Sequence, residues 1–359
     1  MRIGVLTFHR CINYGSYWQA RCLAEGLRTR GHEVVILDHH SRAINLAEWK
    51  CALRPDPGLE SPQADFAALR EKMRRFFHAI DALPLSERFA LDHPGDMEPC
   101  DAVVVGSDEV WNLSHPWYGG RGLFYGDGIR TDRLVAYAAS FGNYDAGCGL
   151  DPAWAAKLRG FDLISVRDDN SRALIERALG FAPDVVLDPC LQFPAESSGG
   201  GDAVAREPYV ALYGHGFSDA FSERVHAWAR RYALPIVSIG YRNQWADAQW
   251  LGAGPQEFAE FIAGAQAVAT NFFHGCVFAL RNRKPFACEA SWYRGNKLQG
   301  LMASVGGERH LLSNDAPAAA CDALLDAPPD ALVFERIARL REKSWRYLDL
   351  ALEPQVRFA

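Results

Sequence analysis

The chain has 359 residues, 49% of them hydrophobic and 23% charged, and its formal net charge is -6. This length predicts two domains of ordinary size, and the slightly acidic balance argues against a nucleic-acid-binding protein. The apolar start over residues 1–7 is too short for a signal peptide, and no run approaches the ~20 apolar residues of a transmembrane helix, so we expect a cytoplasmic protein without an integral membrane segment. Nine scattered cysteines without a Cys-x-x-Cys pair predict reduced thiols and no metal site.

The first elements of the chain predict a βαβ unit. Residues 2–8 read as a strand, residues 17–30 as a helix, and residues 33–38 as a second strand. The unit has neither the Gly-x-Gly-x-x-Gly fingerprint nor the Walker lysine loop, so it predicts neither a dinucleotide-binding domain nor an NTPase. In the loop before the helix, Asn13 and Tyr14 are candidates for substrate contact on one side of a cleft, and Ser16 is expected to cap the helix.

A basic helix and a polar loop come next. The helix is expected over residues 64–79, where its charges predict a solvated face. The strand over residues 101–106 ends in a glycine that permits a tight turn, and Ser107 and Asp108 follow it. These two side chains are candidates for the acceptor side of the cleft, where they either present polar atoms to a ligand or brace their own loop. For Asp108, tying down the loop by hydrogen bonds to its own backbone is as good an interpretation as catalysis.

Arg167 ends a strand predicted over residues 161–168. A guanidinium at this edge of the sheet can hold a carboxylate or a phosphate through two parallel hydrogen bonds. An ion pair with the neighbouring Asp168 or Asp169 is an equally good interpretation of the sequence. The last strand of this half is expected over residues 184–189.

A change of composition divides the chain. Residues 197–202 are rich in serine and glycine and predict a linker, after which the alternation of strands and helices begins again. We therefore expect an N-terminal α/β domain over residues 1–196 and a C-terminal α/β domain over residues 203–328. A closing helix within residues 329–359 would pack back toward the first domain. The predicted fold is α/β, with two Rossmann-like parallel-sheet domains facing a cleft in a GT-B-like arrangement, which on pattern alone suggests transfer of a glycosyl or similar group.

The stretch around His274 is the centre of the second domain. Ala267–Thr270 predicts a buried strand, polar Asn271 ends it, and His274-Gly275 opens a helix. A histidine at such a junction lies beside unpaired helix N–H groups, where anionic ligands bind. A histidine that merely caps the helix or is satisfied in the core is the competing interpretation.

Several short motifs together resemble the polysaccharide pyruvyl transferase family, over residues 1 to about 310. The Gly-Ser-Asp-x-Val-Trp-Asn string and the His-Gly helix are specific as a pair, whereas each alone is weak. The motifs are Asn13-Tyr14-Gly15 with Gln19, Val105-Gly106-Ser107-Asp108 with Val110-Trp111-Asn112, Ser165-Val166-Arg167-Asp168, Leu187-Asp188-Pro189, Phe273-His274-Gly275 and Lys284-Pro285.

The resemblance implies transfer of an enolpyruvyl group from phosphoenolpyruvate to a sugar or lipid-linked glycan, with closure of a ketal and release of phosphate. It implies no cofactor and no metal. His274 would act as the acid or base, because imidazole exchanges protons near neutral pH. Arg167, Lys297, Asn271 and the amides after Gly275 would bind the donor. Lipid-linked acceptors would be reached by a cytoplasmic protein working peripherally at the inner membrane face.

The sequence departs from the family pattern at Phe272, where many members carry an arginine or a small hydroxyl residue. Compensating cations would have to come from Arg281, Arg283 or Lys284, although the two arginines are expected to face solvent. Sugar rings could stack on tryptophans, for which the candidates are Trp245, Trp250 and Trp292.

Two other functions are compatible with the pattern. One is a GT-B glycosyltransferase that uses a nucleotide-sugar, and the other is a catalytically silent binding relative whose sequence support is Phe272 alone.

Overall fold

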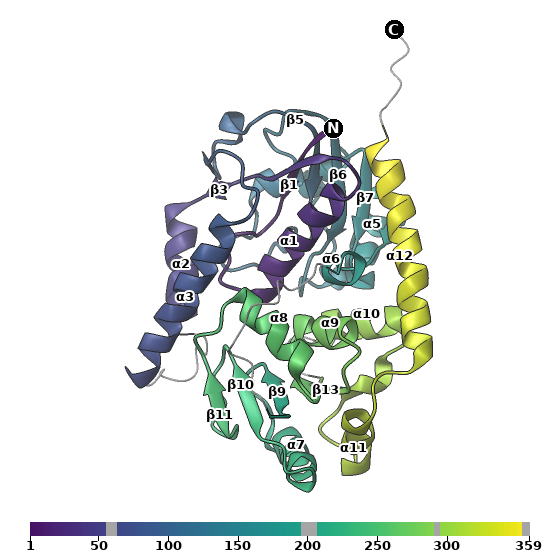
Figure 1. The fold of residues 1–359 in the computed structure, drawn as a ribbon. Coiled ribbons are helices and arrows are strands. Elements are labelled where there is room, and N and C mark those ends of the chain that lie inside the picture. The colour runs from purple at the N-terminus through teal and green to yellow at the C-terminus, as the bar shows by residue number, and fades with distance from the viewer. Residues whose placement is uncertain (55–62, 195–206, 291–294, 354–359) are drawn as a thin grey trace.

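Two parallel sheets dominate the computed structural model, which describes residues 1–54, 63–194, 207–290 and 295–353. The first sheet has the strand order β2-β1-β5-β6-β7-β8, and the second has the order β11-β10-β9-β12-β13-β14. Each sheet is built from one continuous half of the chain, with helices packed on it (Figure 1). The expected linker at 197–202 lies outside the described residues.

The first sheet is buried on both faces, as parallel sheets are. Its central strand carries Val103, Val104 and Val105, all without solvent exposure. This apolar run cannot face water on either side, so helices must cover the sheet. The strands are β1 (Arg2–Leu6), β2 (Glu33–Ile36), β5 (Cys100–Val105), β6 (Thr131–Ala139), β7 (Leu163–Val166) and β8 (Asp184–Val185), with a separate pair β3 (His39–His40) and β4 (Phe89–Ala90). The helices of this half are α1 (Tyr14–Arg28), α2 (Arg42–Leu53), α3 (Phe66–Asp81), α4 (Pro152–Leu158), α5 (Asp169–Leu179) and α6 (Pro189–Gln192), with 3-10 turns at η1 (Gln63–Asp65), η2 (Pro94–Asp96), η3 (Gly122–Tyr125) and η4 (Ala146–Cys148).

The second sheet repeats the same construction. Its central pair, β9 and β12, has no exposed residue along either strand. The strands are β9 (Val210–Tyr213), β10 (Ile236–Ile239), β11 (Ala248–Trp250), β12 (Ala267–Thr270), β13 (Phe286–Glu289) and β14 (Leu311–Leu312). The helices are α7 (Asp219–Arg231), α8 (Pro255–Gly264), α9 (Phe273–Arg281), α10 (Gly295–Val305), α11 (Ala318–Asp326) and α12 (Ala331–Leu352), with η6 (Glu308–His310) before β14. These two Rossmann-like units confirm the predicted fold class.

The two halves are joined by direct contacts. Helix α1 of the first half reaches the start of α8 in the second, where the Tyr14 hydroxyl donates to the Ala253 carbonyl at 2.7 Å and Trp18 Nε1 donates to the Pro255 carbonyl at 2.8 Å. Helix α12, yellow in Figure 1, runs from α10 in the second half to the first sheet. There the Tyr347 hydroxyl donates to the Ala136 carbonyl at 2.7 Å.

Two local expectations differ from the structure. Helix α1 begins at Tyr14, because the side chain of Asn13 caps it by accepting from the amides of Gly15 and Ser16. Ser16 is therefore inside the helix and is not its cap. The basic helix is α3, and one of its cations, Lys72, is only 3% exposed and donates to the Gly240 carbonyl at 3.1 Å. Its face is thus partly an interface between the two halves.

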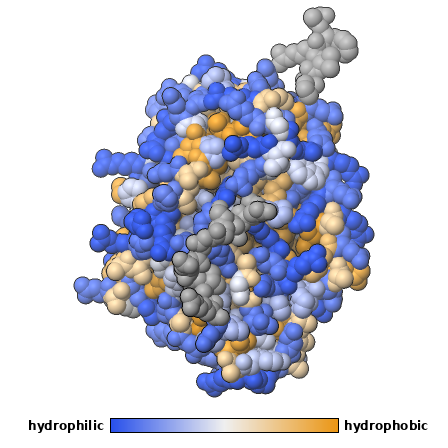
Figure 2. Space-filling view, viewed as in Figure 1, coloured by the Kyte–Doolittle hydropathy of each residue, from blue (hydrophilic) through white to orange (hydrophobic). Residues whose placement is uncertain are grey.

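Hydrophilic side chains cover most of the face seen in Figure 2, with smaller apolar patches between them. Patches of this kind are normal on a folded surface. Within the described ranges, no helix has the length and apolar character required to cross a bilayer.

Candidate active site

A cleft of about 490 Å³ lies between the two sheets. Loops after β1, β5 and β7 form one wall, and residues at or after the ends of β9, β10 and β12 form the other. The carboxyl ends of the strands of both sheets therefore face this space, which is where α/β proteins bind their ligands.

His274 is the second residue of α9, and its side chain is 12% exposed on the cleft wall. Its Nε2 lies 3.5 Å from Oδ2 of Asp188. The opposite ring edge packs against α1 at Gly15, where any Cβ would overlap Nδ1 and its neighbouring ring atoms. Gly15 thus makes the space that the imidazole occupies, and the ring is held between the two halves of the chain.

Asp188 is buried, and one of its carboxylate oxygens faces both a guanidinium and an imidazole. It caps α6, accepting the Cys190 amide through Oδ1 at 2.9 Å. Its Oδ2 lies 3.2 Å from Arg167 Nη1 as well as near His274. Burial raises the pKa of Asp188, but His274 and Arg167 outweigh burial and bring that pKa to about 2. The carboxylate is therefore a permanent negative charge behind the imidazole at neutral pH.

Arg167 connects Asp188 to helix α1. Its Nη1 also donates to Gln19 Oε1 at 2.7 Å, and the Ser107 hydroxyl donates to the same oxygen. The guanidinium carbon lies 4.5 Å above the Phe273 ring. Three buried atoms in this network have no hydrogen-bond partner among the described residues, namely Arg167 Nε, Gln19 Nε2 and His274 Nε2. Buried polar atoms usually have partners, so these three atoms are candidates for contact with a ligand or a water molecule.

The second cation of the cleft is Lys297 of α10. It forms an ion pair with Glu109, which also accepts from Asn112 Nδ2 at 2.8 Å. Burial raises the pKa of Glu109, but the ammonium of Lys297, with Arg167 and Asn112, lowers that pKa to about 2. Both cationic residues that line the cleft in the described part of the chain, Arg167 and Lys297, are thus already paired with carboxylates.

Asp108 and Ser16 lie side by side on the first wall of the cleft. The Ser16 hydroxyl donates to Asp108 Oδ2 at 2.6 Å, and Oδ1 accepts the Glu109 amide at 2.8 Å. Asp108 has a φ of 80°, a left-handed conformation that its loop hydrogen bonds stabilise. Asn13 also lines the cleft, although its oxygen is used to cap α1. Asp108 therefore ties down its own loop and also lines the cleft, and its part in catalysis stays a prediction.

Four other candidate residues lie behind the cleft wall. Tyr14 is buried in the joint between the halves, with its ring stacked on Phe258 at 4.4 Å. Asn271 is fully buried, and its Nδ2 donates to the His215 carbonyl at 2.9 Å. The Ser107 hydroxyl donates to Gln19 Oε1. Gly275 lets α9 approach the end of β12, because a Cβ there would overlap Thr270 Oγ1.

Phe272 occupies the cleft wall inside an aromatic cluster. Its ring meets those of Tyr213 and Tyr241 edge-on at 5.0 and 5.1 Å. The cations considered as substitutes do not line the cleft. Arg281 is only partly exposed and lies over Trp18, whereas Arg283 is exposed, as expected, and lies over Phe334.

The tryptophans considered for sugar stacking also lie elsewhere. Trp245 packs against Phe217 at 5.7 Å between centroids, and Trp250 packs against Phe261 at 5.9 Å. Trp292 is outside the described residues.

One group of side chains has the spacing of a metal site. The ligand atoms of Asp188, Cys190 and His274 lie within 4.8 Å of one another. However, Arg167 already holds the carboxylate, and burial raises the pKa of the Cys190 thiol well above its usual value. A cation would meet a guanidinium and a protonated thiol, so these residues fit a metal poorly.

Two further residues of the site, Asp188 and Glu109, have only weak signals in the sequence. Asp188 stands in the Leu-Asp-Pro motif, but an aspartate before proline is equally typical of a helix cap. Glu109 stands within the Gly-Ser-Asp motif, yet its partner Lys297 is 188 positions away. Neither pairing is visible from local sequence.

The fold of the chain is similar to those of several solved proteins. A UDP-GlcNAc 2-epimerase from Methanocaldococcus jannaschii has 12% identity and a TM-score of 0.51, and the match covers 96% of this chain and 100% of the epimerase. The Streptomyces sp. SF2575 glycosyltransferase SsfS6 has 13% identity and a TM-score of 0.46, with 98% of each chain covered. For the Thermobaculum terrenum O-GlcNAc transferase the identity is 12% and the TM-score 0.39, and the match covers 98% of this chain but spans only 64% of that protein.

The likeness to the epimerase supports the two-domain GT-B fold and says nothing more about activity. No curated protein sequence matches the chain. A family model does match, over residues 13–292, a span that includes the Asn13 cap, Arg167, Asp188 and His274. The match extends over well more than half of the chain, and the protein therefore belongs to the polysaccharide pyruvyl transferase family.

Proposed function

We propose that the protein transfers the enolpyruvyl group of phosphoenolpyruvate to sugar hydroxyls and closes a pyruvate ketal, with release of phosphate. The observation that carries this proposal is the meeting of His274, Arg167 and Lys297 around one cleft in a chain of this family. An imidazole provides proton transfer, and two cations match the carboxylate and the phosphate of the donor.

The donor would lie against α9. The first amides of that helix, through Gly275, have no acceptor within the helix, and they suit a phosphate. Arg167 and Lys297 would hold the carboxylate and the phosphate after exchanging part of their contact with Asp188 and Glu109. Asn271 would contribute indirectly. Its Nδ2 donates to the His215 carbonyl, which fixes the chain just before α9, the helix that carries His274.

The reaction needs one proton donor and two sugar hydroxyls. His274 gives its proton to C3 of phosphoenolpyruvate, and the resulting positive charge at C2 is attacked by the first hydroxyl oxygen. The bond from C2 to the phosphate oxygen then breaks, and the second hydroxyl oxygen bonds to C2. Of the two hydroxyl protons, one restores His274 and the other leaves with phosphate, so the atoms and charges balance.

Asp188 would stabilise the protonated imidazole before the transfer. Its charge lies 3.5 Å from Nε2, and its low pKa keeps it ionised at the working pH. The acceptor would enter beside Asn13, Ser16 and Asp108 on the opposite wall. Phosphoenolpyruvate is a cytoplasmic metabolite, so we place the reaction in the cytoplasm, with lipid-linked acceptors met at the inner membrane face.

Calorimetric titration of the purified protein with phosphoenolpyruvate, and separately with nucleoside diphosphates, tests the donor. The expected result is saturable binding of phosphoenolpyruvate that is lost in Arg167→Ala and kept in the matched control Arg172→Ala, whose arginine is exposed on α5. Binding of a nucleotide instead would favour a nucleotide-sugar glycosyltransferase. Binding of neither would favour a catalytically silent relative.

A further inference from the structure

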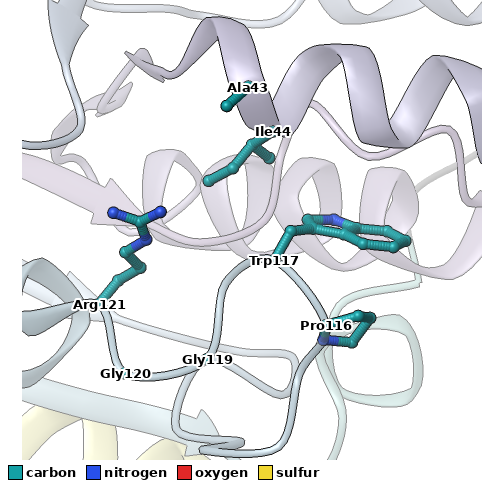
Figure 3. A pocket seen from close by; sticks show the side chains of 7 residues that line it. All are labelled: Ala43, Ile44, Pro116, Trp117, Gly119, Gly120 and Arg121. Atoms are coloured by element: carbon teal, nitrogen blue, oxygen red, sulfur yellow. The ribbon is translucent and has the colours of Figure 1, made fainter.

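A second hollow, of about 400 Å³, adjoins the cleft and has no part in the proposed transfer. Trp117 and Pro116 line both spaces and form the ridge between them. Figure 3 shows these two residues on one side of the second hollow, Arg121 on the other, and Ile44 of α2 above. The two spaces are therefore neighbouring sections of one surface that passes over an indole.

Trp117 is fixed in place from the protein side. Its Nε1 donates to Glu48 Oε1 at 2.8 Å, and the other oxygen of Glu48 accepts the Ile12 amide at 3.3 Å. The His115 ring meets the indole edge-on at 5.3 Å. A ring held by a hydrogen bond and a packed neighbour loses little conformational entropy when a ligand covers it, so it is a preorganised platform.

The other walls of the hollow combine polar and close-packed groups. Arg121 uses Nη1 to pair with Asp92 at 3.0 Å, and the guanidinium has further N–H groups to donate. The floor is backbone at Gly119 and Gly120. A Cβ at Gly119 would overlap the carbonyl oxygens of the surrounding loop, and Gly120 has a φ of 69°, so both positions favour glycine.

An aromatic platform opposite hydrogen-bond donors is suited to a sugar ring. A pyranose has an apolar face of C–H groups, which gains free energy by covering an indole, and hydroxyls around its rim, which need donors and acceptors. A wholly apolar ligand would not use the remaining N–H groups of Arg121, and a small anion would not use the indole. The volume is within the ~300–1,000 Å³ typical of ligand sites.

We infer that the acceptor is an oligosaccharide whose sugar units extend from the cleft across Trp117 into the hollow at Arg121. The unit that receives pyruvate lies by His274, the next stacks on Trp117, and a further unit reaches Arg121. This inference rests on the proposed function, because it requires a glycan in the cleft. It adds that a monosaccharide is a poor acceptor and that Trp117 determines the preference for length.

The test measures glycan binding without donor, on an array that carries mono-, di- and trisaccharides of several hexoses and N-acetylhexosamines. The wild-type protein is expected to bind at least one trisaccharide tenfold or more tighter than its monosaccharide. Trp117→Ala should remove that length dependence, and Trp117→Phe, which keeps a ring but loses the bond to Glu48, should keep part of it. Trp49→Ala is the matched control, because Trp49 is 38% exposed on α2 and lines neither hollow.

An unchanged length dependence in a folded Trp117→Ala protein overturns the inference, and so does a wild-type protein that binds no oligosaccharide on the array. Arg121→Ala adds a second check, since this partly exposed side chain lies outside the core. The substitution should weaken the binding of trisaccharides while sparing disaccharides. Calorimetry with phosphoenolpyruvate is run on the same variants. If the wild-type protein does not bind phosphoenolpyruvate, the result counts against the proposed function alone. If it binds phosphoenolpyruvate but shows no dependence of glycan binding on length, the result counts against an oligosaccharide acceptor.

Discussion

Nε2 of His274 lies 3.5 Å from Oδ2 of Asp188, although the two residues come from different halves of the chain. The imidazole can keep this position only while the halves stay closed on each other. The same carboxylate oxygen lies 3.2 Å from Arg167, so one buried charge positions both the imidazole and a guanidinium. The candidate site is therefore complete only when the two halves are packed against each other.

Replacing His274 by alanine should reduce turnover by about 10²–10⁴-fold, because a positioned general acid contributes that much. The ring is on the cleft wall and not in the core, so the fold should remain intact. Phosphate release from phosphoenolpyruvate in the presence of acceptor measures the rate, and circular dichroism checks the fold. Normal turnover in a folded His274→Ala protein would remove the histidine from the mechanism.

Gly15→Ala should lower turnover by about 10²-fold without touching a reacting group. The added methyl group occupies the space of the imidazole edge, and displacement of a catalytic group by about 1 Å has a cost of that order. Since alanine favours helices more than glycine, any loss comes from the displaced ring and not from α1 itself.

Gly26→Ala is the control for this substitution. Gly26 is in the same helix, and its added methyl group would meet the Phe193 ring in the core instead of the cleft. It should lower the free energy of unfolding while leaving the turnover of folded molecules unchanged. Equal turnover losses in the two variants would mean that His274 is not the group affected at Gly15.

Local pattern predicted most of the fold, because apolar runs between polar loops specify buried parallel strands. The strand at Ala267–Thr270 has the bounds expected for it, and two α/β halves follow from the alternation of elements. The position of Tyr14 was harder to predict from the sequence, because it depends on whether Asn13 or Ser16 caps α1. A shift of the helix start moves the Tyr14 side chain from the cleft into the contact between the two halves. The pairs formed by Asp188 and Glu109 depend on how the halves close, which no local pattern encodes.

Glu109→Gln should tighten phosphoenolpyruvate binding by about tenfold, or about 1.4 kcal/mol. The carboxylate now holds Lys297 and also repels an anionic donor, and the amide would do neither. Calorimetric titration at low and high salt measures the effect, which should shrink as salt screens the charges.

The control for Glu109→Gln breaks an ion pair away from the cleft. Glu25→Gln removes the partner of Arg21 along α1, outside the residues that line the cleft, and should leave donor affinity unchanged. Weaker donor binding in Glu109→Gln would instead indicate that Glu109 positions Lys297 for the donor and does not compete with it.

Asp188→Asn should lower the free energy of unfolding at pH 7 by about 3–5 kcal/mol, because it leaves the buried Arg167 without its counter-charge. The pKa of Asp188 is lowered from 3.8 to about 2 in the folded protein. The ionised carboxylate therefore contributes about 2 kcal/mol that is fully present above pH ~4 and is lost as the pH falls through about 2. Urea unfolding of the wild-type and Asp188→Asn proteins between pH 7 and pH 2 should show the difference between their free energies of unfolding shrinking over that acidic window.

The control is Asp184→Asn, which breaks an exposed ion pair with Lys343. It should lower the free energy of unfolding by at most about 1 kcal/mol. A difference that stays constant down to pH 2 would mean that the charge of Asp188 neither stabilises the closed cleft nor couples His274 to Arg167.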